Sequence, residues 1–405
     1  MLEPFLRPWL GAFDNIYAIA AVWIGLAFLA SLISIRVGLS VALVEILVGV
    51  AAGNLFHLST NAWIDFLASF GSVLLTFLAG AEIDPRSLRR FAVPSLAIGG
   101  VGFLVPFAGA WAFAWFALHW QWHASQIAGV ALSTTSVAVV YAVMVDTGLN
   151  KSELGKLILT ACFVCDLGTV LALGVLFANY NALLIGFAIA TAITLLLLPR
   201  TLRLVLGTLG HAVSEPEVKF TFLLLLGLGG LAAAARSEAV LPAYLLGLVA
   251  AGVFHEDPRL MSRVRATAFS LLTPFFFLKA GTLISIPAVI AGVVSVVVLF
   301  LVKMAAKLVG VFPTTIGFKL RGRQAWYTTM MMSTGLTFGS ISALFGLIHG
   351  YIDRAQYSVL VTVVVLTALV PTLIAQAFFY PKTSSLRYGS ATPAEPPELK
   401  AATGS

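Results

Sequence analysis

The chain has 405 residues, of which 60% are hydrophobic and only 10% are charged. Soluble domains carry about 25% charged residues, so this composition excludes an ordinary soluble globular protein. The formal net charge of +7 does not indicate nucleic-acid binding, because the basic residues lie in short segments between apolar runs and form no stripe along a helix. We therefore expect a membrane protein.

Apolar runs long enough to cross a bilayer recur along almost the whole chain. A spanning helix needs about 20 mostly apolar residues, and with this criterion the sequence predicts thirteen helices. They cover residues 17–35, 40–57, 62–82, 92–118, 125–145, 155–178, 180–198, 218–236, 239–256, 267–286, 287–312, 324–349 and 356–380. The joints at 178–180 and 286–287 are the weakest. The prediction is an all-α polytopic protein with a single transmembrane unit over 1–380 and a disordered tail over 381–405.

The basic residues of the loops predict the orientation of the chain. After the first, third, fifth and every later odd-numbered helix, the loop or tail carries Lys and Arg, and these segments hold 18 of the 24 basic residues. The loops on the other side hold only Arg7, Arg236 and Arg354. Lys and Arg accumulate in cytoplasmic loops. We therefore expect a multi-pass protein of the plasma (inner) membrane, with its N-terminus outside and its C-terminus in the cytoplasm.

Two of the predicted helices have polar centres. The run 125–145 contains Ser133, Thr134, Thr135 and Ser136, and the run 324–349 contains Ser333, Thr334, Gly335 and Thr337. If the first six and the last six helices form two inverted repeats, both runs are the fifth helix of their repeat. Paired interrupted helices at matching positions indicate the substrate site of a secondary transporter. The alternative is that these small residues only allow close helix packing.

Asp166 lies at the centre of the run 155–178. Ionisable residues inside the membrane are costly and mark ion or proton paths. A carboxylate there must pair with a base, bind a cation or take up a proton, and the last two options together describe an exchanger. We therefore predict Asp166 as the site where a monovalent cation and protons compete. The alternative is a buried ion pair that holds helices together.

Three lysines also fall inside predicted helices. Lys303 and Lys307 lie one turn apart on one helix face. Lys307 is predicted to contact Asp166 or the carbonyl groups of a broken helix, with Lys303 in the same network, and snorkelling of Lys307 to the interface is the alternative. For Lys279 two interpretations stay open, a place along the outer path or snorkelling. Glu45 is expected to have a structural role.

The other chemistry-bearing residues have simpler interpretations. Glu82 and Asp84 close a predicted helix, where neighbouring arginines are their expected partners. The histidines lie near helix ends or in loops, and Cys162 and Cys165 are expected to be packing residues. The sequence contains no metal cluster, nucleophile triad or phosphate-binding loop, so we predict no cofactor and no enzyme activity.

Several stretches together resemble the monovalent cation:proton antiporter family, which has the sodium/proton exchanger fold. They are Leu43–Gly49, Phe77–Pro85, Ser133–Ser136, Asp166, Pro274–Gly281 and Lys307–Gly310. The resemblance implies a dimerisation domain and a core domain interleaved in sequence, crossed broken helices at the two polar centres, an elevator-like movement of the core and a homodimer. It also implies that Asp166 binds the ion and that Lys307 is the basic residue of the core.

One residue departs from the family pattern. Electrogenic members carry two adjacent acids in this helix, whereas Cys165 precedes Asp166 here. One carboxylate predicts one proton per cation and therefore electroneutral exchange. The potassium-efflux branch often appends a cytosolic nucleotide-binding domain, and its absence from this chain favours Na⁺. The open alternatives are a K⁺/H⁺ antiporter, a sodium-coupled organic-anion symporter and a cation channel.

Overall fold

The computed structural model describes residues 15–58, 60–178, 182–209, 214–235, 237 and 239–381, and these residues form helices and no strand. The first nine helical segments are α2 (Ile16–Val37), α3 (Val41–Leu55), α4 (Ala62–Ala81), α5 (Pro85–Arg90), α6 (Ala92–Phe116), α7 (Trp122–Ser133), α8 (Val137–Asp146), the 3₁₀ turn η1 (Leu149–Lys151) and α9 (Glu153–Leu176). The weak joint at 178–180 and the tail lie almost wholly outside the described residues.

The second half continues with another series of helices. They are α10 (Ala182–Leu209), α11 (Pro216–Ala234), α12 (Val240–Glu256), α13 (Pro258–Thr267), the π-helical turn η2 (Ala268–Leu272), α14 (Thr273–Thr282), α15 (Ile286–Ala291), α16 (Val293–Gly317), α17 (Arg323–Met332), α18 (Thr337–Ile348) and α19 (Arg354–Phe378). The π turn comes just before Pro274, which has no N–H for the regular helical bond. The expected run 287–312 is divided at Gly292 into α15 and α16.

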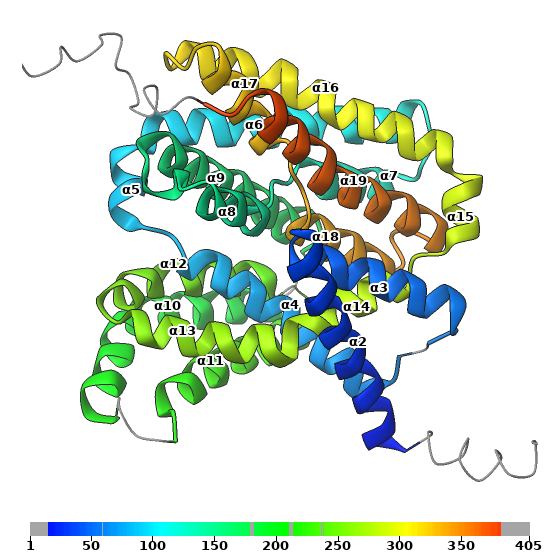
Figure 1. Cartoon of the computed structure of the whole chain (residues 1–405). Helices are drawn as coiled ribbons and strands as arrows, with labels where there is room; N and C mark the ends of the chain where they lie inside the picture. The colour runs from blue at the N-terminus through cyan, green and yellow to red at the C-terminus, as the bar shows by residue number, and fades with distance from the viewer. Residues whose placement is uncertain are drawn as a thin grey trace, which may run out of the picture.

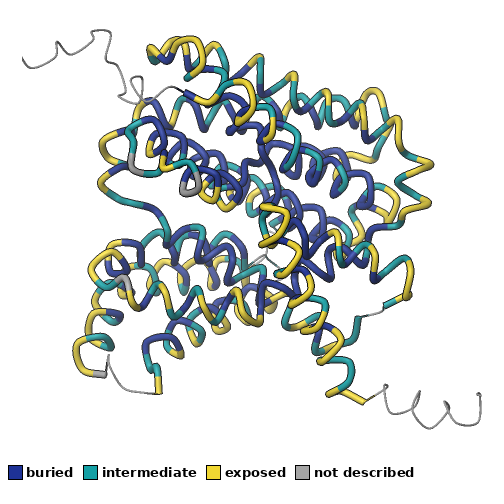
Figure 2. Tube along the Cα trace, in the orientation of Figure 1, coloured by how far each residue is buried: buried dark blue, intermediate teal, exposed yellow. Residues whose placement is uncertain are grey.

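The all-helical membrane fold is confirmed. Among the described residues, ten helical stretches are long and apolar enough to cross a membrane, while α3 and α12 are shorter apolar helices. The count of thirteen spans therefore stays a prediction. Buried residues fill the interior and exposed ones lie along the outside (Figure 2). Many of the exposed residues have large apolar side chains. A bilayer, rather than water, suits such a surface.

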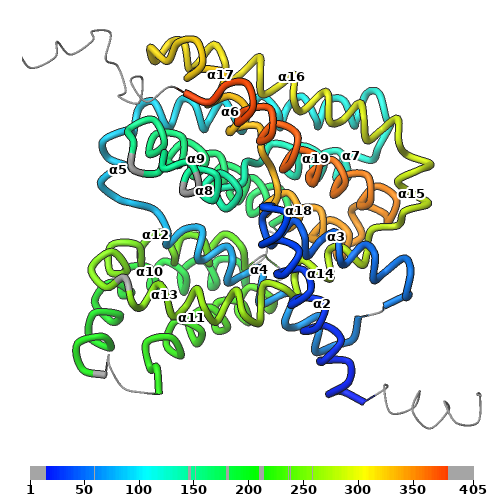
Figure 3. Tube along the Cα trace, in the orientation of Figure 1, coloured from blue at the N-terminus to red at the C-terminus, as the bar shows by residue number. Residues whose placement is uncertain are grey.

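The helices pack in two groups, each built from both halves of the chain. We call α2–α4 and α10–α14 the scaffold group, and α6–α9 and α16–α19 the core group (Figure 1). In Figure 3 the scaffold group combines blue and green segments, and the core group combines cyan and teal segments with yellow to red ones. Helices α5 and α15 connect the groups, which touch mainly where α12 packs against α9.

Glycines bring the scaffold helices into backbone contact. A Cβ added at Gly80 of α4 would overlap the carbonyl oxygen of Tyr244 on α12, and one at Gly247 would overlap the carbonyl oxygen of Phe77. Helices α3 and α14 cross in the same way at Gly49. Such close approach is how membrane helices gain packing energy without a hydrophobic driving force. These contacts therefore hold α4 against α12 and α3 against α14.

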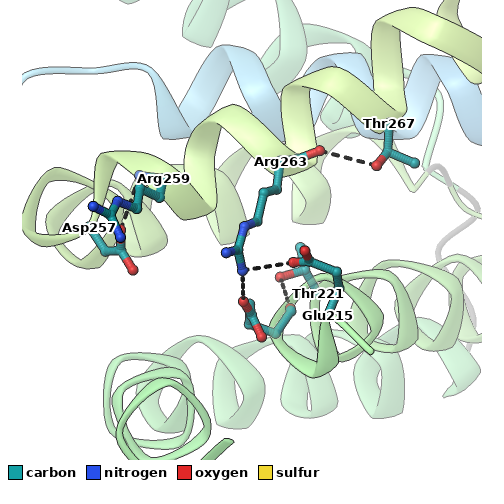
Figure 4. A network of polar contacts seen from close by, with 7 residues as sticks. Glu215, Thr221, Asp257, Arg259, Arg263 and Thr267 are labelled. Atoms are coloured by element: carbon teal, nitrogen blue, oxygen red, sulfur yellow. Dashed lines mark hydrogen bonds and ion pairs between the residues drawn. The ribbon is translucent and has the colours of Figure 1, made fainter. Parts of the chain in front are cut away.

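A charged network fixes one end of the scaffold group (Figure 4). Arg263 Nη1 on α13 donates to Glu215 Oε2 at 2.8 Å and to Glu217 Oε1 at 2.6 Å, and the Glu217 side chain is buried. Asp257 caps α13 by accepting the N–H of Arg259. Removing one partner of a buried ion pair leaves an uncompensated charge, so this network holds α11 against α13. We call this end of the molecule, which also carries α5, the basic end.

Candidate functional site

Two interrupted helices meet at the centre of the core group. The first break, 134–136, separates α7 from α8, and the second, 333–336, separates α17 from α18. All of these residues are buried. The N–H of Ser136 donates to Thr334 Oγ1 at 3.4 Å, so the two breaks are in contact. The predicted pair of broken helices is therefore confirmed, and unwound backbone lies buried in the protein as membrane proteins require.

Asp166 lies beside the first break. It is 1% exposed, and Thr135 Oγ1 lies 3.1 Å from its Oδ1 atom and 3.1 Å from the carbonyl oxygen of Cys162. Asp166 forms no ion pair with any described residue, so no basic nitrogen among them lies within 4.0 Å of its carboxylate. The structure thus gives this buried acid a hydroxyl partner and no direct counter-charge.

The Thr135 hydroxyl has only one proton to donate. If Asp166 is protonated, its O–H can donate to Thr135 Oγ1, and Thr135 can donate to the Cys162 carbonyl, so both short distances are satisfied. If Asp166 is ionised, Thr135 must choose between the two acceptors. The carboxylate, the hydroxyl and the carbonyl then form a set of oxygens suited to an alkali cation that has lost part of its hydration shell.

Lys307 belongs to α16, and its Nζ lies at the C-terminal end of α7. It does not form an ion pair with Asp166. Its Nζ donates to the carbonyl oxygen of Ser133 at 2.9 Å and lies 3.6 Å from Cys165 Sγ. The Cys165 thiol also donates to the Ser133 carbonyl, at 3.3 Å. A cation at a helix C-terminus interacts favourably with the free carbonyl groups there. Of the two contacts predicted for Lys307, the structure contains the carbonyl contact.

Lys303 reaches the second break. Its fully buried Nζ donates to Thr367 Oγ1 on α19 at 3.0 Å. A Cβ added at Gly335 would overlap this Nζ and would lie 3.0 Å from Thr134 Oγ1. The ammonium group therefore lies between the two breaks, and Gly335 leaves the space that it occupies. Thr367 was not predicted, because a lone threonine in an apolar helix gives no signal of its partner.

The remaining candidate hydroxyls mostly satisfy their own backbone. Ser133 and Thr134 donate to carbonyl groups one turn earlier in α7, and Ser333 donates to the carbonyl of Thr329 at 2.7 Å. Thr337 opens α18 and is buried. Among the predicted hydroxyls, Thr135 is therefore the one that reaches Asp166, and the others end or cap the broken helices.

A cavity of about 530 Å³ opens between the scaffold and core groups at the basic end. Its lining includes Glu82, Asp84 and Arg265 from the scaffold side and Lys156 and Phe163 from α9. Its volume is far above the ~10–15 Å³ that one water molecule needs. Asp166 is absent from the lining, whereas Phe163 on its own helix and Val137, the first residue after the first break, both line the cavity.

The charged residues at the mouth of this cavity are paired, as expected for Glu82. Arg265 Nη2 donates to Glu82 Oε1 at 2.5 Å, and His255 Nε2 lies 3.7 Å from Asp84 Oδ1. Burial raises the pKa of Glu82, and the Arg265 charge offsets this only in part. Burial also acts to raise the pKa of Asp84, but the Ser87 hydroxyl and backbone N–H groups donate to its carboxylate and hold the pKa below its usual value.

Other predicted residues lie outside the crossing. Lys279 forms a 2.7 Å ion pair with Asp65 inside the scaffold group, at the end opposite the basic end. This acidic partner was absent from both interpretations of Lys279. Cys162 Sγ lies 3.5 Å from Met332 Sδ in a packing contact, and Glu45 is buried in α3. The described residues contain no cluster of three or more His, Cys, Asp or Glu side chains that could hold a metal ion.

The fold and the site together define a class of protein. Apolar helices, two interleaved groups and two interrupted helices that meet beside a buried acid are the architecture of a secondary transporter. Residues 24–379 match the family described as sodium/hydrogen exchanger, transmembrane. The chain belongs to this family, the members of which are membrane transporters and not enzymes.

Individual relatives agree with this assignment. A probable Na⁺/H⁺ antiporter 3 of Methanocaldococcus jannaschii is 26% identical over 253 residues, which cover 60% of this chain and 64% of that protein. An Na⁺/H⁺ antiporter of Enterococcus hirae is 25% identical, and the match covers 86% of this chain and 94% of the relative. The solved structure of the M. jannaschii sodium proton antiporter MjNhaP1 at pH 8 has a TM-score of 0.68 at 15% identity, covering 94% of this chain and all of that one.

Proposed function

We propose that this protein exchanges a monovalent cation, Na⁺, for one proton across the plasma membrane, and that Asp166 carries both ions in turn. The observation that carries this proposal is the buried Asp166 carboxyl group, which has Thr135 as its partner and no basic residue within ion-pair distance. A group in that position needs a proton or a cation. The names of the Na⁺/H⁺ antiporters among the relatives support Na⁺ as the cargo.

Strict exchange of a cation for a proton follows from the free-energy cost of moving Asp166 without a bound ion. An ionised Asp166 with no cation would be a buried charge without a direct counter-ion, which costs several kcal/mol even with the Thr135 hydroxyl beside it. With a proton or a cation bound, the site is neutralised and the core group can move past the scaffold group. Only the two loaded forms then cross, so inward movement of one ion is tied to outward movement of the other.

We propose further that one proton moves per cation, so that transport is electroneutral. Cys165 supplies a thiol where a second acid would be needed for a second exchangeable proton, and the two buried lysines of the core group, Lys303 and Lys307, contact neutral groups. In this scheme Lys307 stabilises the carbonyl end of α7 at Ser133, and Lys303 holds Thr367 beside the second break.

The same proposal assigns roles to the two groups of helices. The core group carries Asp166 between the two sides of the membrane, and the scaffold group forms the contact between two copies of the chain in a homodimer. The clustering of Lys and Arg at the basic end supports a cytoplasmic location for that end. The large cavity would then open toward the cytoplasm, as in an inward-facing transporter.

Proteoliposomes with an imposed pH gradient and an internal fluorescent pH indicator test this function. Addition of Na⁺, K⁺ or Li⁺ in turn should dissipate the gradient fastest for Na⁺, and Asp166→Asn should abolish the effect. Thr135→Val should raise the Na⁺ concentration for half-maximal exchange about tenfold, because one hydrogen bond to a charged group contributes about 1.5–3 kcal/mol. Thr329→Val is the matched control, since its buried hydroxyl bonds only within α17.

Several outcomes would change the proposal. Exchange by Asp166→Asn would exclude Asp166 as the carrier. Dissipation by K⁺ but not by Na⁺ would replace the cargo. Transport driven by a membrane potential, with no ion gradient, would contradict one-to-one stoichiometry, and rapid cation flux without counter-flow of protons would indicate a channel.

A further inference from the structure

Tyr244 is a scaffold residue that contacts both halves of the core next to Asp166. It lies on α12 and is fully buried. Its ring stacks on Phe163 of α9 with centroids 5.2 Å apart and planes at 16°, and it meets Phe338 of α18 edge-on at 5.9 Å. Its hydroxyl donates to the carbonyl oxygen of Phe163 at 3.1 Å. One side chain therefore joins the scaffold to the helix of Asp166 and to a broken helix.

The Phe163 ring of this pair borders the cavity close to Asp166. Phe163 lines the cavity, whereas neither Tyr244 nor Asp166 does. Phe163 precedes Asp166 by three residues, which places them on neighbouring turns of the same face of α9. At the Asp166 end, the cavity is thus bordered by Phe163, whose ring stacks on Tyr244, and by Val137, the first residue of α8.

The backbone of Tyr244 is held more firmly than a gate on a loop would be. Its carbonyl oxygen packs against Gly80, and Gly247, one turn later, packs against the backbone of α4. Any movement that separates Phe163 from Tyr244 must therefore come from the core group or from rotation of the side chains. The scaffold supplies a fixed surface against which α9 opens.

Adjacent carbonyl groups of α9 connect this contact to the ion site. The Cys162 carbonyl accepts from Thr135 beside Asp166, and the Phe163 carbonyl accepts from Tyr244. A shift of this turn of α9 that changes one contact also changes the other. Binding at Asp166 and release of the scaffold are thus coupled through one turn of helix.

We propose that Tyr244 is the gating residue on the scaffold side, which closes the path from the basic end to Asp166 by holding Phe163 and which must release the Phe163 carbonyl when the core moves. This inference rests on the proposed function of Asp166 as the ion site. Tyr244 acts through Phe163 and does not touch the ion, so it is a positioning residue.

The two native cysteines allow a direct test. Cys162 and Cys165 are the only cysteines of the chain, both are buried, and both lie within one turn of Asp166. A membrane-impermeant, cationic methanethiosulfonate reagent is added to the basic-end side of oriented vesicles, and the rate of thiol modification is followed by mass spectrometry. The single variants Cys162→Ser and Cys165→Ser identify which thiol reacts.

Two variants of Tyr244 distinguish the effect of its ring from the effect of its hydroxyl group. Tyr244→Ala should raise the modification rate at least tenfold, because the path to the thiols opens. Tyr244→Phe keeps the stacked ring, so its modification rate should stay within about twofold of the parent rate. Its turnover in transport should rise about threefold, because the core no longer breaks a hydrogen bond to the scaffold.

Tyr357 provides a matched control at the other end of the molecule. It is also fully buried, and its hydroxyl donates to the carbonyl of Ala280 at 2.7 Å, joining α19 of the core group to α14 of the scaffold group. Tyr357→Ala should leave modification from the basic end unchanged. If it accelerates modification as much as Tyr244→Ala does, the effect is general loosening and the proposal is wrong.

Two further arms keep the test decisive. Phe163→Leu removes the core-side ring and should also raise the rate at least tenfold, so the test does not depend on the folding of Tyr244→Ala. All rates are repeated in the Asp166→Asn background, where ion exchange is not needed for the readout. A parent-like rate in both Tyr244→Ala and Phe163→Leu would overturn the gate, while the transport assay judges the role of Asp166 separately.

Discussion

The scaffold and core groups place their charged residues and their helix breaks differently. In the scaffold group the helices pack backbone to backbone at glycines, and the ion pairs lie near helix ends, as in Lys279–Asp65 and Glu82–Arg265. In the core group two helices are interrupted at mid-depth, and Asp166, Lys303 and Lys307 lie buried around the breaks. Glycine-to-backbone contacts also occur in the core group, at Gly99 against the Ala161 carbonyl and at Gly339 against the Ala131 carbonyl. Close packing is therefore common to both groups, and the interrupted helices with their mid-depth polar residues belong to one of them, although the segments of the two groups alternate along the sequence.

The first prediction concerns the packing of the scaffold. Gly247→Ala places a methyl group against the backbone of α4 at Phe77 and Ala81. Because backbone atoms cannot give way cheaply, the change should lower the free energy of unfolding by about 3 kcal/mol. Thermal unfolding in detergent measures this loss. Gly252→Ala on the same helix has no neighbouring atom within 4 Å and should be as stable as the parent; equal stability of both variants would show that α4 and α12 are not in backbone contact.

The second prediction concerns a substitution in the core group that should lower the exchange rate and leave the fold intact. Gly335→Ala places a methyl group on the Lys303 ammonium, a flexible group that can move away. The fold should therefore survive, while the displaced charge should lower the exchange rate about 30-fold, equal to about 2 kcal/mol. Proteoliposome transport and thermal unfolding are measured together. Gly100→Ala in α6 meets no atom within 4 Å and should be active. Full activity of Gly335→Ala would mean that the position of Lys303 does not matter.

The sequence predicts those features of the two groups that a single local segment reveals, and it does not predict contacts between distant segments. The broken helices were predictable, because Ser133–Ser136 and Ser333–Gly335 interrupt apolar runs locally. Asp166 was predictable, because an acid at mid-membrane is costly wherever its neighbours lie.

Other contacts depend on helices far apart in the sequence. Tyr244 with Phe163, Lys303 with Thr367, and Lys279 with Asp65 are ordinary residues until packing brings them together. Helix lengths were also harder to predict, since the boundary of α14 depends on a π turn and on Pro274 rather than on hydropathy.

The third prediction tests whether Lys303 is needed for transport rather than for the stability of the fold. Lys303→Met keeps most of the side-chain volume and removes the charge. Stability should stay equal or increase, because replacing a buried charge by an apolar group is often neutral or stabilising. The exchange rate should fall about tenfold, equal to about 1.4 kcal/mol, since the second break loses the amine that donates to Thr367 beside Gly335. Thr367→Val should show a smaller loss, and an unchanged rate in both variants would make Lys303 a packing residue.

The fourth and smallest effect is a pair of opposite pH dependences at the cavity mouth. The pKa of Glu82 is raised, so its contribution to stability is present at acidic pH and is lost as pH rises from about 4.5 through its folded-state pKa. The pKa of Asp84 is lowered, so its contribution is present at neutral pH and is lost as pH falls below about 3.8.

Thermal unfolding against pH checks this pair. The difference in Tm between the parent and Glu82→Gln should shrink as pH rises, by an amount on the order of 1 °C. The difference between the parent and Asp84→Asn should shrink as pH falls. Slopes of the same sign for the two variants would contradict the two environments described for these neighbouring acids.

In the proposed mechanism Asp166 exchanges a single proton for a single cation, and proton release on cation binding measures this directly. Purified protein in weakly buffered detergent solution is titrated to saturation with Na⁺, and the released protons are counted with a pH indicator. We expect one proton released per chain for the parent and none for Asp166→Asn. Two protons per chain, no release by the parent, or release by Asp166→Asn equal to that of the parent would contradict the proposed mechanism.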